Sequence, residues 1–234
     1  MKVALILSAL FLSACGGGGG GSDVPVAPSA STSAFALDTA STNFYTVPRT
    51  FNLNAVVNGT AFNVILSYSP QPDVIFEGVL SKVNQATSTV RENNVVQFSD
   101  TVLRFFTTGP LLFRGATSMG DPDGQNYLVS TFSDRLPATA NVGSTGPVAT
   151  ALYFTDVGKT NPRGSEVLTY SLEADTANTA FLCTNSTIRN QLNLILLTQS
   201  ECIKINPAGD ELGLKVLLGE YTNGSFVRTI EFQE

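Results

Sequence analysis

Thr50–Tyr68 reads TFNLNAVVNGTAFNVILSY, and this stretch predicts two β-strands joined by a tight turn. Asn58-Gly59 is a preferred pair for a two-residue type I′ turn, because both central residues of that turn need positive φ. A two-residue loop here fixes the register and pairs Val57 with Thr60, Ala55 with Phe62, Leu53 with Val64 and Phe51 with Leu66. Polar residues alternate with these pairs, so we expect one face of the hairpin in a core and the other in water.

A second copy of this pattern is found downstream. Thr169–Phe181 aligns with Thr50–Phe62 without a gap and shares six identical residues. In this alignment Cys183 takes the place of Val64, which predicts that it faces Leu172 on the apolar side. The similarity indicates either an internal repeat or a chance likeness between two hairpins.

The remaining pattern predicts an all-β fold, an antiparallel sandwich or barrel-like domain. Turn signals such as Asn206-Pro207 and Asn223-Gly224 separate short apolar runs, and no stretch shows a convincing amphipathic helix. Further strands are predicted over 74–80, 95–98, 101–107, 111–115, 125–132, 148–155, 191–198, 202–205, 212–221 and 226–232. The domain is expected over 43–234, with two lobes, 43–135 and 136–234, as one arrangement.

The N-terminus predicts secretion. A lysine, a short apolar run and small residues precede Cys15, and the run is too short to span a bilayer. Leu12-Ser13-Ala14-Cys15 resembles the lipobox of bacterial lipoproteins. The resemblance implies that the signal peptide 1–14 is cleaved and that Cys15 is lipidated, with palmitate among the expected acyl chains. An ordinary signal peptide with an incidental cysteine is the alternative.

Residues 15–42 are predicted to form a flexible tether. Gly16–Gly21 is an unbroken glycine run, and a stretch rich in Pro, Ser and Ala follows it. The lipid on Cys15 would attach the domain to the membrane of the cell envelope. Because Gly16 rather than aspartate follows the cysteine, the resemblance implies the outer membrane of a Gram-negative cell, or the outer face of the plasma membrane of a Gram-positive one.

Three segments of the mature chain also resemble uncharacterised proteobacterial lipoproteins. They are 136–143, 170–176 and 201–209, and they carry no known activity. This resemblance supports the expected compartment and implies no chemistry.

Composition bounds the partners and the redox state. Removal of Lys2 with the signal peptide leaves 12 basic and 19 acidic side chains, a formal net charge of −7. An acidic surface disfavours phosphate binding, so nucleic acid is not expected as a partner. Cys183 and Cys202 form an even pair in a secreted chain and predict one disulfide, with two buried free thiols as the alternative.

The chain predicts no catalytic, metal-binding or cofactor-binding residue. It contains no histidine, which excludes Ser-His-Asp catalysis and histidine-based zinc sites. Ser118 lies in a variant of the serine nucleophile elbow but lacks that partner, and Gly158-Lys159-Thr160 lacks the first glycine of a phosphate-binding loop. Asp121–Asn126 has too few carboxylates for a full calcium loop, and a simple turn explains it equally well.

Three functions remain open. The leading one is a non-enzymatic envelope module that binds a protein partner or helps to build the envelope. The second is a carrier of a lipid or small apolar ligand, which requires an interior cavity. The third is a carboxylate-based hydrolase or lyase, which requires a converging pair such as Glu77 with another acid.

Overall fold

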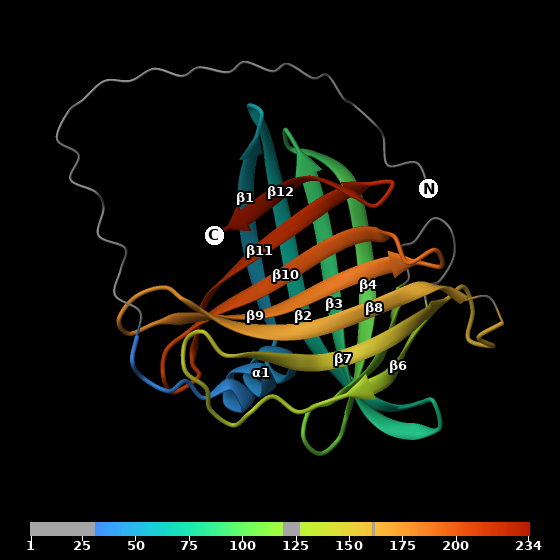
Figure 1. The fold of residues 1–234 in the computed structure, drawn as a ribbon, viewed down its shortest axis with the longest axis horizontal. Coiled ribbons are helices and arrows are strands. Elements are labelled where there is room, and N and C mark those ends of the chain that lie inside the picture. Colours follow the sequence, from blue (N-terminus) through green and yellow to red (C-terminus); the bar gives the residue numbers. More distant parts are fainter. Residues whose placement is uncertain (1–30, 119–126, 161) are drawn as a thin grey trace.

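A computed structural model describes residues 31–118, 127–160 and 162–234, and in it the strands form one closed antiparallel barrel (Figure 1). The elements are α1 (Leu37–Thr46), β1 (Arg49–Val57), β2 (Thr60–Phe76), β3 (Val79–Glu92), β4 (Val95–Thr107), β5 (Phe113–Ser118), β6 (Tyr127–Ser133), β7 (Thr145–Phe154), β8 (Pro162–Ala174), β9 (Ala180–Asn190), β10 (Ile195–Ile205), β11 (Glu211–Thr222) and β12 (Ser225–Gln233). The all-β prediction is confirmed, and both expected lobes contribute to this single sheet. The lipobox, Cys15 and the segment Asp121–Asn126 lie outside the described residues.

The first hairpin has the predicted register. Val57 pairs with Thr60 and Phe51 with Leu66, and the turn residues Asn58 and Gly59 have φ of 51° and 80°. The prediction from Thr50–Tyr68 is therefore confirmed residue by residue, because the turn type and the apolar alternation specify the same pairing.

The second hairpin differs from its predicted register by one residue. Cys183 pairs with Ser171, and Leu172 pairs with Leu182 in the core instead. The connection between β8 and β9 is the five-residue segment 175–179, not a two-residue turn. A slip of one residue moves every side chain to the opposite face of the sheet, so Cys183 lies on the outer wall and not on the apolar face.

One helix closes an end of the barrel, which the sequence did not predict (Figure 1). Leu37, Ala40 and Phe44 are buried at helical spacing on α1, and Phe44 packs against Tyr68 with ring centroids 4.7 Å apart. The expected tether therefore ends earlier than residue 42. Phe35 already pairs with Ala140 through backbone hydrogen bonds of 2.8 and 3.0 Å.

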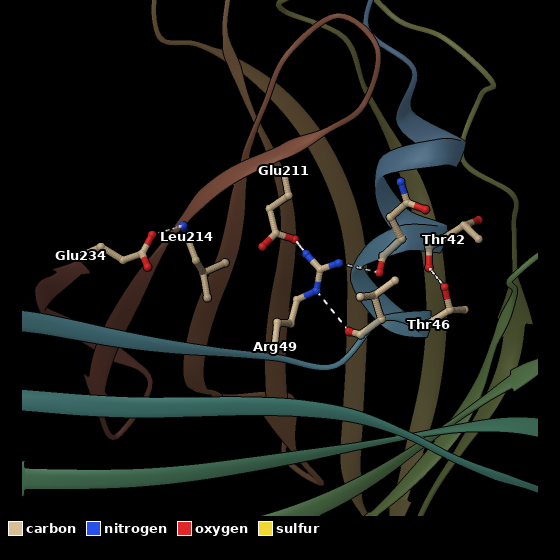
Figure 2. A network of polar contacts seen from close by, with 8 residues as sticks. Thr42, Thr46, Arg49, Glu211, Leu214 and Glu234 are labelled. Atoms are coloured by element: carbon tan, nitrogen blue, oxygen red, sulfur yellow. Dashed lines mark hydrogen bonds and ion pairs between the residues drawn. The ribbon is translucent and has the colours of Figure 1, made fainter.

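Arg49 fixes the C-terminal turn of this helix. Its guanidinium donates to the carbonyl of Asn43 at 2.8 Å and forms an ion pair with Glu211. Figure 2 shows Arg49 and Glu211 facing each other. A cation near a helix C-terminus stabilises the unpaired carbonyls there. The same side chain also joins the start of β1 to the start of β11.

The barrel closes along a short seam between β1 and β12. Among the described residues, Asn54 and Gln233 are the one residue pair in register between these strands, whereas β1 pairs with β2 along the whole length of β1. Side chains reinforce the region: besides the Arg49–Glu211 pair, the Glu234 carboxylate accepts from the backbone N–H of Leu214 at 3.1 Å (Figure 2).

A second apolar cluster lies outside the main core. Phe76, near the tip of the β2–β3 hairpin, stacks on Phe105 with centroids 4.1 Å apart and contacts Tyr127 at 5.5 Å. Gly115 makes this approach possible. A Cβ on that residue would lie 2.1 Å from the carbonyl oxygen of Leu128 and 2.8 Å from the Phe76 ring.

We expect Gly115→Ala to destabilise the barrel by roughly 1–3 kcal/mol, the usual cost of overpacking. The added methyl meets a backbone atom that cannot move alone, and the residue has φ of +154°. Urea unfolding followed by circular dichroism measures the loss. Gly109→Ala is the matched control, because nothing lies within 4 Å of its Cβ position. Equal stability of the two variants would contradict the packing role of Gly115.

Candidate functional site: a polar-lined cavity inside the barrel

The barrel encloses a cavity of about 340 Å³. A ring of twelve strands is wider than wall side chains alone can fill, and α1 occupies only part of the interior. The cavity is bounded by side chains of α1 and of the strands β4–β10. Its apolar lining includes Val102, Phe106, Phe113, Leu128, Leu168 and Ile188.

An ion pair crosses the interior. The Arg104 guanidinium donates to both oxygens of Glu201, at 3.1 and 2.7 Å. Arg104 is on β4 and Glu201 on β10, and five strands separate them around the barrel in either direction. The pair therefore ties opposite walls together. Both side chains line the cavity, and 21% and 11% of their surfaces stay accessible.

The surroundings of this pair favour the charged form of Arg104. Burial alone would lower the pKa of Arg104, but the Glu201 carboxylate together with Tyr45 and Tyr68 more than compensates and holds that pKa well above its usual value. Burial also raises the pKa of Tyr68 well above normal, with a contribution from Glu201, so the phenol stays neutral. The Tyr68 ring lies 5.7 Å from the guanidinium carbon, within the range of a cation–π contact.

Glu166 is a second buried carboxylate in the wall. Its side chain accepts from the Tyr153 hydroxyl at 2.9 Å and from the Ser186 hydroxyl, and the residue is only 8% exposed. Burial, followed by the charge of Glu166, raises the pKa of Tyr153 well above its usual value. Tyr153 is thus a permanent hydrogen-bond donor at physiological pH.

Asp100 and Ser118 form a third polar group in the lining. The Ser118 hydroxyl lies 2.9 Å from each carboxylate oxygen of Asp100. Ser118, which resembles a nucleophile only by its flanking residues, therefore donates its hydroxyl hydrogen to a carboxylate.

The sequence did contain a signal for this site. In β4 the residues Asp100, Val102, Arg104 and Phe106 share one face, and in β8 Glu166 and Leu168 do so. Residues two apart in a strand lie on the same face, so charged side chains at this spacing from apolar ones point inward with them. This pattern indicates a polar interior instead of a uniformly apolar core. The pairing of Arg104 with Glu201 has no such local signal, since 97 residues separate them.

The predicted disulfide between Cys183 and Cys202 is present. It joins directly opposed residues of β9 and β10, and both cysteines are fully buried although they lie on the outer wall. Lys215 lies over Phe181, 4.1 Å from its ring centroid, beside this pair. Glu173 completes a group with potential metal ligands, but two sulfurs bonded to each other offer no thiolate to an ion.

Glu77 lies away from the cavity. It is at the turn between β2 and β3, where it accepts from Tyr127 and Lys159, each at 2.6 Å. These bonds hold the pKa of Glu77 below its usual value, Lys159 contributing most. The contacts of Glu77 are thus a phenol and an ammonium, and they fasten the bent hairpin tip to the outer wall.

No model of a known protein family matches this chain, and no curated protein or solved structure is found to be similar to it. Within the described ranges, no helix is long and apolar enough to cross a membrane.

Proposed function

We propose that this protein is a lipid-anchored module of the bacterial cell envelope whose barrel binds a small ligand with an apolar body. The observation that carries the proposal is the interior cavity, whose volume of about 340 Å³ is in the range of small-molecule sites. Its walls combine apolar side chains with a few fixed polar groups, which is the composition such sites share. Among the functions that the sequence left open, the carrier required a cavity of this kind.

The anchor belongs to the proposal through the lipobox Leu12–Cys15. A lipidated Cys15 would hold the barrel at a membrane, where ligands with apolar bodies are concentrated. Two or more acyl chains give durable attachment.

Native mass spectrometry of the protein extracted from its own membrane tests both parts. We expect a covalent lipid mass that survives unfolding and a second mass that is lost on unfolding. Ala116→Phe would place a ring in the cavity and abolish the second mass, since Ala116 lines it. Thr117→Phe, on the neighbouring position of β5, is the control that retains it. A second mass kept by Ala116→Phe, or absent from the unaltered protein, would refute ligand binding in the cavity.

A docking module is the second candidate, and exposed apolar side chains favour it. Val56, Val95, Leu192 and Phe226 are 59–78% exposed and lie beside the turns β1–β2, β3–β4, β9–β10 and β11–β12. Exposed apolar groups that gather at one end of a barrel are typical of protein-binding surfaces. A bare protein mass in the experiment above would favour this function over the carrier.

A further inference from the structure

The charges of the cavity wall are strongly unbalanced. Among the described residues that line the cavity, the acidic ones are Asp100, Asp134, Glu166 and Glu201, and Arg104 is the basic one. A cavity with this lining attracts cations and repels anions, because charges interact strongly where little water is present.

The charge of the Arg104 guanidinium is already paired within the cavity. Its two terminal nitrogens donate to the two oxygens of Glu201, so the carboxylate neutralises the guanidinium. A ligand with a carboxylate or phosphate would have to displace Glu201 and leave a buried acid unpaired, which is costly. This arrangement disfavours fatty acids and other anionic amphiphiles.

Glu166 has unused capacity to accept hydrogen bonds. Tyr153 and Ser186 each donate one bond, to different oxygens of the carboxylate. A carboxylate offers about four lone-pair sites, so roughly two remain. No lysine or arginine of the described chain forms a recorded ion pair with Glu166, although 92% of this residue is withdrawn from solvent. A buried carboxylate without a cation gains from one that arrives with a ligand.

Apolar surface lies close to this carboxylate. Leu168 follows Glu166 on the same face of β8, and Ile188 on β9 is the cross-strand partner of Glu166. These side chains would cover the hydrocarbon part of a molecule whose charged end reaches Glu166.

We propose that the ligand is an organic cation, a protonated amine or quaternary ammonium on an apolar body, and that Glu166 binds its nitrogen. The inference rests on the proposed ligand-binding function and names the chemical class of the ligand. A protonated amine would donate to the free lone pairs of Glu166, while its hydrocarbon part packs on Leu168 and Ile188.

Three soluble probes of equal length test the charge preference on the full chain: 4-phenylbutylamine, 4-phenylbutanol and 4-phenylbutyrate, each titrated calorimetrically at pH 7. We expect the amine to bind at least about tenfold more tightly than the alcohol, as for a hydrogen bond to a charged group, and the carboxylate to bind most weakly. Equal affinities for all three would overturn the cation preference and leave the cavity as a ligand site. Failure of all three to bind would count against the proposed function itself.

Glu166→Gln tests the residue. We expect this variant to lose about tenfold in affinity for the amine and to keep its affinity for the alcohol. Glu173→Gln is the matched control, because Glu173 is on the same strand but exposed. If Glu166→Gln binds the amine as the unaltered protein does, Glu166 is not the binding group. The probe comparison on the unaltered protein stays decisive should the variant fold poorly.

Discussion

Arg104→Met is expected to lower the free energy of unfolding by about 3 kcal/mol. Removal of one partner leaves the Glu201 carboxylate without its cation in the interior, and breaking a buried pair typically costs roughly 3–5 kcal/mol. We expect the lower end, because part of both side chains faces the cavity. Unfolding in guanidinium chloride, monitored by circular dichroism, measures the change.

A double substitution separates the cost of leaving one charge unpaired from the cost of removing both charges. Arg104→Met combined with Glu201→Met removes both charges, and we expect it to recover most of the loss, since apolar replacements of buried pairs are often neutral. The control is Arg228→Met at the surface pair with Glu220, whose side chains are 39% and 42% exposed. We expect a loss below about 1 kcal/mol there. A double variant as unstable as the single one would show that Arg104 acts through packing instead.

Loss of the disulfide is expected to cost about 3 kcal/mol. Cys183 and Cys202 are 19 residues apart, and closing a loop of this length restricts the unfolded chain by that amount. For a chain of this size the midpoint of thermal unfolding would fall by roughly 6–12 °C in the variant Cys183→Ala/Cys202→Ala.

Reductant provides the control for this experiment. The unaltered protein should lose stability once reduced, whereas the double alanine variant should unfold at the same temperature with and without reductant. If the unaltered protein and the variant had the same midpoint in oxidising buffer, the bond would not contribute to stability.

Local sequence was sufficient for much of the barrel wall. The turn at Asn58-Gly59 and the alternation around it specify the first hairpin fully. The second hairpin shows where local pattern fails, because a longer connection changed the register by one residue while the apolar positions looked alike. The helix α1 was missed because a short segment rich in Thr, Ser and Asn has little helical preference, and packing of Leu37 and Phe44 decides its structure.

The cavity was less accessible to sequence reasoning than the wall. A hydroxyl group such as that of Ser186 looks like part of an ordinary strand residue until the strands are placed around a common interior. The ion pair across the interior depends on the number of strands between β4 and β10, which a pattern of single strands does not contain.

The order of the strands has a consequence for how the chain folds. Every neighbour pair except β12 with β1 joins consecutive strands, so each hairpin can form early from contacts between nearby residues. Closing the ring is different, because β1 must find a strand that lies near the other end of the described chain. This step has the largest loss of chain entropy, yet it forms the shortest pairing between neighbouring strands. The seam, with Arg49 and Glu211 beside it, is therefore where we expect the last step of folding and the first step of unfolding.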